Sequence, residues 1–196
     1  MSVLLIAGSP AERSRSAALL DETGRRLARR GAVVEQLLIR NLSPQALLLA
    51  DVGHPSVSHA IGQVKRAEVI VIATPVYKAA YSGVLKVFLD LLEQTAFKGK
   101  AVLPLATGGS ANHMLALDYA LRPVLQSLGA KHILPSIYAT DAQVTLTGEG
   151  AYQVNHEISA RLDEAVQTLI TESLRPDVKP AGHFSPVLFS QVRCSV

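Results

Sequence analysis

Short apolar runs alternate along the chain with longer stretches in which apolar residues recur every three or four positions. The runs are rich in Val, Ile and Leu, as buried strands are, and cover residues 3–7, 33–39, 69–73, 101–106 and 133–139. The longer stretches have helical spacing and cover residues 16–30, 56–66, 83–93, 112–128 and 155–174. This alternation predicts an α/β fold, in which right-handed crossovers build a parallel sheet with helices on both faces.

Five such strands fit the doubly wound order 2-1-3-4-5, a three-layer sandwich. A sheet of this kind binds its ligand outside the carboxyl ends of the strands, near the point where the winding reverses. The segments after the first, third and fourth strands are therefore the candidate binding segments. Two prolines modify the pattern. Pro104 predicts a bulge or a sheet edge in the fourth run, and Pro123 predicts a kink or break near Arg122.

Size and composition fit one folded domain. The chain has 196 residues, of which 48% are hydrophobic, and it has no tryptophan, a balance typical of α/β proteins. We expect the domain to span residues 1–174. Over residues 175–196 the pattern gives way to prolines and isolated hydrophobics, which predicts a tail that is mobile or docked on a neighbouring subunit.

Charge and cysteine content narrow the classes of partner. The formal net charge is +3, with Lys and Arg scattered and not interleaved with aromatics, which argues against nucleic-acid binding and favours anionic small ligands. The single cysteine, Cys194, rules out an intrachain disulfide, and the first apolar run is too short for a signal peptide or a membrane span. We expect a cytoplasmic protein without a metal site, since the histidines lack metal-ligand spacing.

The segment over residues 8–16 follows the first strand and opens the first helix, and small and hydroxyl residues predominate in it. Its backbone N–H groups and serine hydroxyls are expected to hold an anion at the positive end of the helix dipole. Arg13 or Arg15 would add charge-assisted hydrogen bonds. The alternative is a simple serine N-cap with solvated arginines. The glycine spacing fits neither a Rossmann nor a Walker loop.

Two further segments are suited to border a planar ring. Residues 74–83 follow the third strand, where Pro75 restricts the backbone and Tyr77 offers an aromatic face. Residues 106–113 follow the fourth strand and contain a Gly-Gly pair that permits close approach to a flat ligand edge. Each segment alone is also an ordinary connection. Together, the three would hold a phosphate and two edges of a ring system, which is the shape of FMN.

These segments resemble those of the NAD(P)H-dependent FMN reductases of the flavodoxin-like superfamily, in particular the alkanesulfonate-utilisation reductases. The resemblance spans roughly residues 1–170. It is carried by Gly-Ser-Pro at 8–10 with Ser-Arg-Ser at 14–16, by residues 73–83, and by Leu-Pro-Leu-Ala-Thr-Gly-Gly at 103–109. It implies a flavodoxin-like sandwich.

The resemblance implies a cofactor-binding set for FMN. The set comprises Ser9, Ser14, Arg15 and Ser16 at the phosphate, Pro75, Val76, Tyr77 and Lys78 at one edge of the isoalloxazine, and Thr107, Gly108, Gly109 and Ser110 at the other. No catalytic side chain is named, because hydride passes from nicotinamide to flavin without a side-chain acid or base. Many relatives carry arginine directly after Gly-Ser-Pro. Ala11 stands there in this chain, so we expect weaker flavin retention.

The resemblance extends over residues 116–125, a helix associated with subunit contacts. Within it, Tyr119 marks either a π-bulge at a specialised interface or a tyrosine in an ordinary helix. A homo-oligomer, either a dimer or a tetramer, is expected, because an open flavin rim needs neighbouring protein to complete a nicotinamide pocket.

The activity implied is reduction of FMN to FMNH2 by NADPH or NADH, with reduced FMN supplied to a flavin-dependent alkanesulfonate monooxygenase. One alternative is a quinone, azo or chromate reductase with tightly bound FMN. An alternative of another class is a flavodoxin-type electron carrier, which the mildly basic charge disfavours, since such carriers are commonly acidic. The sequence leaves open the nicotinamide preference, the role of FMN as substrate or prosthetic group, the monooxygenase and its sulfonate, and the choice between dimer and tetramer.

Overall fold

The computed structural model describes residues 1–148 and 150–173. Within these residues, seven strands form one sheet in the order β2-β1-β3-β5-β6, with β4 paired to β3 and β7 paired to β5, and two more strands form a separate hairpin. The strands are β1 Ser2–Ala7, β2 Val33–Leu38, β3 Val69–Tyr77, β4 Ala80–Tyr81, β5 Ala101–Gly108, β6 His132–Ile133, β7 Ile137–Thr140, β8 Val144–Leu146 and β9 Tyr152–Val154.

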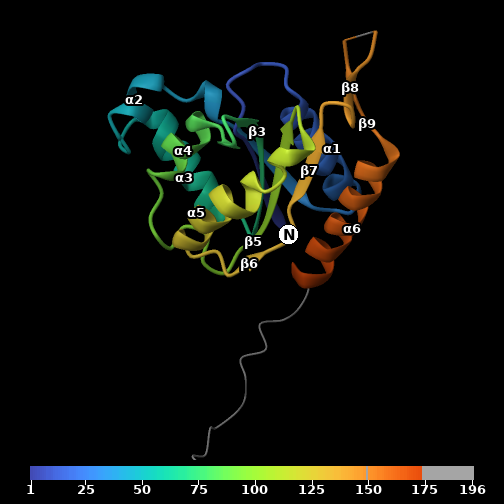
Figure 1. The fold of residues 1–196 in the computed structure, drawn as a ribbon. Helices are drawn as coiled ribbons and strands as arrows, with labels where there is room; N and C mark the ends of the chain where they lie inside the picture. The colour runs from blue at the N-terminus through green and yellow to red at the C-terminus, as the bar shows by residue number, and fades with distance from the viewer. Residues whose placement is uncertain (149, 174–196) are drawn as a thin grey trace, which may run out of the picture.

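Helices cover both faces of the sheet. They are α1 Arg15–Arg29, α2 Pro44–Leu48, α3 Pro55–Arg66, α4 Gly83–Leu89, α5 Arg122–Ser127 and α6 His156–Ser173. Figure 1 shows α1 and α6 on one face and α3, α4 and α5 on the other. Both faces of β1 are buried, because successive side chains of a strand point to opposite faces: Leu4 and Ile6 pack in the core under α3 to α5, and Leu5 packs in the core under α1 and α6.

The parallel register brings the candidate segments to one edge of the sheet. Ala7 at the end of β1 lies beside Ala73 of β3, Pro75 lies beside Thr107 of β5, and Thr107 lies beside Ala139 of β7. With β5 as the fourth main strand and β6 and β7 together as the fifth, the predicted order 2-1-3-4-5 and the flavodoxin-like sandwich are confirmed.

Pro104 lies inside the sheet, so the predicted edge is wrong. It pairs with Ile72 of β3, and β6 and β7 pair along the other side of β5. Val102 accepts a bond from Leu134 on that side, and Pro104, two residues on, faces the same way. The position where Pro104 lacks an N–H donor therefore faces the break between β6 and β7. This break also splits the strand expected over residues 133–139.

The helix expected over residues 112–128 is three pieces: a 3₁₀ turn at Ala111–His113, a π-helix at Leu117–Leu121 and then α5. Because α5 begins at Arg122 with Pro123 in its first turn, the predicted break is confirmed. Tyr119 lies in the π-helix and is 79% exposed, so its interpretation as a residue of an ordinary helix is wrong.

Other elements differ from the sequence prediction at their ends or were not predicted. The helix expected over residues 83–93 ends at Leu89. The short helix α2, the strand β4 and the β8–β9 hairpin have no counterpart among the predicted elements. Residue 174 and the tail predicted over residues 175–196 lie outside the described residues.

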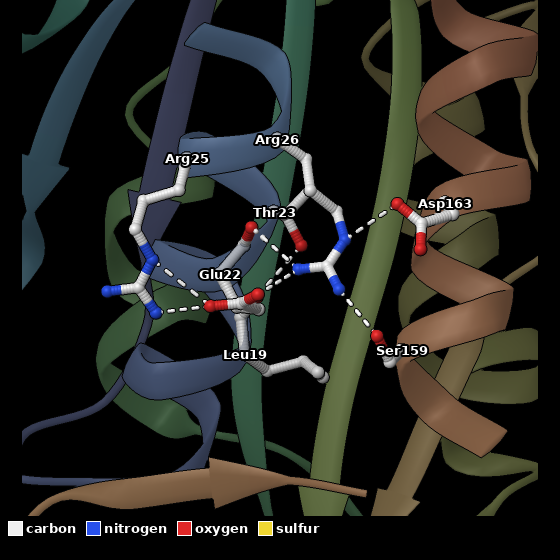
Figure 2. Close-up of polar contacts among 7 residues, drawn as sticks. All are labelled: Leu19, Glu22, Thr23, Arg25, Arg26, Ser159 and Asp163. Carbon is white, nitrogen blue, oxygen red and sulfur yellow. Dashed lines mark hydrogen bonds and ion pairs between the residues drawn. The ribbon is translucent and has the colours of Figure 1, made fainter. Parts of the chain in front are cut away.

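The helices α1 and α6 are held together by a polar cluster centred on Arg26 (Figure 2). From α1, Arg26 donates to Glu22 on its own helix and reaches across to α6, with its Nε 2.9 Å from Asp163 Oδ1 and its Nη2 2.6 Å from Ser159 Oγ. Arg25 also donates to Glu22. This cluster fixes α6, whose preceding hairpin leads to the candidate site. No helix in residues 1–148 and 150–173 has the length and apolar character needed to cross a membrane.

Candidate flavin site

A cavity of about 250 Å³ lies at the carboxyl ends of the strands. It is lined by Ala11, Arg13, Ser14, Arg15, Pro75, Val76, Tyr77, Thr107, Gly108, Gly109, Asp141 and Tyr152. All three segments singled out in the sequence contribute to these walls. The site residues predicted from the sequence but absent from the lining are Ser9, Ser16, Lys78 and Ser110.

The first loop, residues 8–14, presents the start of α1 to this cavity. Ser14 is the N-cap of α1, and its Oγ accepts the N–H of Ala17 at 3.1 Å. The N–H groups of Arg15 and Ser16 precede the first possible intrahelical donor, so they have no acceptor within the helix. They lie at the positive end of the α1 dipole, and the loop therefore suits an anion.

Two of the predicted serines support the first loop from within. Ser9 is 3% exposed, and its Oγ accepts the N–H of Ala11 at 3.2 Å. Ser16 is 1% exposed, with its Oγ 3.2 Å from the Oγ of Ser14. Their hydroxyls hold the loop and its cap in place, whereas Ser14 also reaches the cavity wall.

Arg15 is turned toward the β8–β9 hairpin. Its Nε donates to the Val144 carbonyl at 3.0 Å, its Nη1 lies 3.5 Å from Asp141 Oδ2, and its guanidinium carbon lies 5.8 Å from the centre of the Tyr152 ring. These contacts fix the hairpin as one wall of the cavity. Arg13, which also lines the cavity, is exposed.

The second segment is a strand that turns back sharply. β3 continues through Pro75 and Val76 to Tyr77, and β4 pairs with it antiparallel. Lys78 and Ala79 connect the two strands with φ of 49° and 65°, the left-handed conformations that a two-residue hairpin turn of type I′ requires. The turn leaves Tyr77 half exposed at the cavity wall, and Lys78 at its tip.

Ser82 ties this turn to the first loop. It is fully buried, its Oγ donates to the Gly8 carbonyl, and the same oxygen accepts the Leu85 N–H at the start of α4. Its own N–H donates to Thr74 Oγ1 at 3.0 Å, and Gly8 N–H donates to the Ala73 carbonyl at 2.8 Å. Hydrogen bonds therefore connect the first two cavity segments directly.

Tyr138 of β7 positions the third segment. Its hydroxyl donates to the Ser110 carbonyl at 2.6 Å. Burial and the nearby Asp141 carboxylate raise the pKa of Tyr138, despite the hydrogen bond to Ser110, so the hydroxyl keeps the proton that it donates. A Cβ on Gly108 would lie 2.5 Å from this oxygen, and only glycine leaves room for the contact.

The sequence prediction missed Asp141 and Tyr152, which the fold brings to the cavity from beyond the fourth main strand. Tyr152 lies on the β8–β9 hairpin. Its signal in the sequence is weak: two short runs that alternate apolar and polar residues around Gly148 and Gly150.

A larger cavity, of about 570 Å³, lies between α3 and the segment that follows α4. None of the three candidate segments lines it. Two of its lysines are already engaged, since Lys65 pairs with Glu93 at 3.1 Å and Lys100 donates to the Lys65 carbonyl at 3.1 Å. The cavity at the strand ends is therefore the better candidate for a ligand that carries both a phosphate and a planar ring.

Comparisons with known proteins agree with this geometry. The family model described as NADPH-dependent FMN reductase matches residues 1–145. A relative from Escherichia coli strain K12, named FMN reductase (NADPH), is 42% identical over 179 residues, which cover 91% of this chain and 93% of the relative. The predicted resemblance to FMN reductases is confirmed.

Solved structures support the same fold. An NADH:FMN oxidoreductase in its apo form superposes with a TM-score of 0.80 at 37% identity, covering 87% of this chain and 89% of that one. A flavodoxin from Streptococcus pneumoniae TIGR4, at 14% identity and a TM-score of 0.61, covers 87% of this chain and 98% of its own. At that identity it shows the fold alone.

Proposed function

Because the chain belongs to the NADPH-dependent FMN reductase family, it is a flavin-dependent oxidoreductase, and we propose that it reduces FMN with NAD(P)H and releases the reduced flavin. The observation that carries the proposal is the cavity at the strand ends, where a helix N-terminus meets an aromatic side chain and a glycine edge. The donor set fits FMN, since amides and hydroxyls suit its phosphate and Pro75, Tyr77 and Gly108 suit its ring.

In this proposal the first loop binds the phosphate. The N–H groups of Arg15 and Ser16 and the hydroxyl of Ser14 donate to it, and Ser9 keeps the loop in shape. The Arg15 side chain is engaged by the hairpin and Ala11 carries no charge. Arg13, which lines the cavity, is therefore the arginine proposed to add a charge-assisted bond to the phosphate. Modest flavin retention suits an enzyme that releases reduced FMN.

The ring is proposed to lie between the second and third segments. Pro75, Val76 and Tyr77 border one edge with Lys78 at the rim. Thr107, Gly108 and Gly109 border the other, and the Ser110 carbonyl is held by Tyr138. When bound, FMN accepts hydride from the nicotinamide. The protein supplies position and hydrogen bonds, without a side-chain acid or base.

Reduced FMN reacts with dioxygen, so its consumer is proposed to be a flavin-dependent monooxygenase. The resemblance to the alkanesulfonate-utilisation reductases supports an alkanesulfonate as the substrate class of that monooxygenase. Met114, Leu115 and Tyr119 are each more than half exposed in and just before the π-helix, and we propose that a second copy of the chain covers them in a homo-oligomer.

The nicotinamide is proposed to be NADPH or NADH, since the Escherichia coli relative is named for NADPH and the solved oxidoreductase for NADH.

The test is steady-state NADPH and NADH oxidation with free FMN varied. We expect the rate to saturate with added FMN. Failure of added FMN to support oxidation contradicts the proposal. A protein purified yellow, whose turnover requires a quinone and not free FMN, identifies the tightly bound alternative, and a bound flavin that NADPH fails to bleach identifies an electron carrier.

Two serine N-caps provide a matched pair of variants. Ser14 caps α1 at the cavity and Ser43 caps α2 away from it, each accepting one helix N–H. Alanine at either position costs about 1 kcal/mol of stability. We expect Ser14→Ala to raise the KM for FMN several-fold and Ser43→Ala to leave it unchanged. Equal changes in KM would contradict the placement of the phosphate.

A further inference from the structure

Arg40 reaches the first loop from outside the flavin cavity. It lies in the 3₁₀ turn Ile39–Asn41 that follows β2, and its Nη1 donates to the Ala11 carbonyl at 3.0 Å. The turn is anchored because Ile39 is fully buried and its carbonyl accepts the Leu42 N–H at 3.0 Å. The first loop is thus held at its tip by a cation on a fixed support.

This bond orients the peptide group between Ala11 and Glu12. In a trans peptide the C=O and N–H groups point in opposite directions. With the Ala11 carbonyl directed at Arg40, the Glu12 N–H points away from it. Ala11 lines both the flavin cavity and a smaller cavity, of about 150 Å³, that Arg40 lines, so the loop separates the two. The bond therefore keeps a carbonyl dipole away from the flavin side and leaves that side to N–H donors.

Arg40 also adds a positive charge beside the first loop, whose own charged side chains are the exposed Glu12 and Arg13. Arg15 is engaged by the hairpin. The carboxylates that line the cavity beside Arg40 are Glu12 and Asp21, and Asp21 accepts a hydrogen bond from Gln36 at 2.9 Å. Within residues 1–148 and 150–173, neither carboxylate forms an ion pair with Arg40. The Arg40 charge therefore has no direct ion-pair partner among the residues that the structure describes.

We propose that Arg40 is a positioning residue for the flavin phosphate: by holding the Ala11 carbonyl, it keeps the first loop in its anion-binding conformation. The inference rests on the proposed function, since the anion it invokes is the phosphate of FMN. It assigns to a residue after β2 a role in a loop that belongs to β1 and α1.

The test compares the binding of FMN with that of riboflavin, which lacks the phosphate. Each flavin is titrated with the protein, and the flavin fluorescence is measured to obtain the Kd. Arg40→Ala is expected to raise the Kd for FMN about tenfold and to leave the riboflavin Kd within about twofold. The tenfold change corresponds to the loss of one charge-assisted hydrogen bond whose strength is reduced because Arg40 is partly exposed. Arg29→Ala removes the same charge near the far end of α1, about 20 Å away along the helix, and is expected to change neither.

A second variant separates position from charge. Arg40→Gln retains a donor for the Ala11 carbonyl without the charge, and we expect it to bind FMN at least about threefold more tightly than Arg40→Ala. A glutamine variant no better than alanine, an equal loss for both flavins, or no loss in Arg40→Ala overturns the inference. Wild-type protein that fails to bind FMN at all overturns the proposed function instead, so the two failures are distinct.

Discussion

Replacement of Gly108 by alanine tests the packing that positions the third segment of the site. The added Cβ would lie 2.5 Å from the Tyr138 hydroxyl oxygen and 3.4 Å from Val76 Cβ. The first distance is shorter than any ordinary contact, and Tyr138 is 7% exposed, with its hydroxyl bonded to the Ser110 carbonyl. The tyrosine must therefore move and release that carbonyl.

The expected cost has two parts. Loss of the Tyr138 hydrogen bond costs about 1 kcal/mol, and overpacking of a filled site costs about 1–3 kcal/mol. We expect Gly108→Ala to lower the free energy of unfolding by about 2–4 kcal/mol, which leaves a domain of ordinary stability folded. Since the Ser110 carbonyl is no longer held, FMN binding weakens as well.

The assay is urea unfolding of the wild type, Gly108→Ala, Tyr138→Phe and the double variant. Tyr138→Phe alone is expected to cost about 1 kcal/mol. In the double variant the clashing oxygen is absent, so it should be more stable than Gly108→Ala by about 1–2 kcal/mol. Additive costs for the two changes would refute the reasoning. Gly83→Ala serves as the control, because a Cβ there meets nothing within 4 Å, and it should not be destabilising.

Two further predictions concern the rest of the domain. Burial acts to raise the pKa of Glu22, but hydrogen bonds from Arg25 and Arg26 outweigh it and lower the pKa below the ordinary 4.5. The stability from this carboxylate is therefore present above about pH 4.5 and lost as pH falls through the lowered pKa. In urea unfolding, the deficit of Glu22→Gln relative to the wild type should shrink in acid, and a deficit independent of pH would contradict the linkage. Ser82→Ala removes the cap of α4 and the donor to Gly8, so we expect a loss of about 2–3 kcal/mol together with weaker FMN binding. Unchanged FMN affinity would show that the two segments are not coupled through Ser82.

The sequence located the main strands and the candidate segments because hydrophobic periodicity is a local property of the chain. Buried runs of Val, Ile and Leu marked β1, β3 and β5 to within a few residues, and the doubly wound order placed their carboxyl ends on one edge. The effect of each proline on its helix or strand was harder to predict. The break before α5 at Pro123 was predicted, since a proline within a helix acts on its own turn.

The inserted elements were not predictable from local pattern. The energetic cost of placing Pro104 in a strand depends on what lies opposite the N–H group that proline lacks. In the structure this position lies opposite the break between β6 and β7, which the local sequence does not reveal. The π-helix around Tyr119 and the β8–β9 hairpin are short, and short elements carry little periodic signal. Their conformations are settled by packing against the rest of the chain.

The sequence by itself determined the fold class, the positions of the main strands and the segments from which a flavin site could be built, and it fitted a strand order that the structure confirms. Only the tertiary structure decided what each side chain in those segments does. Ser9 and Ser16 support the loop from within, Arg15 turns to the hairpin, and Arg40 approaches from β2. The physical reason is that hydrogen bonds and ion pairs depend on distances of a few ångströms between residues far apart in the chain, and these exist only after the sheet has aligned its strands.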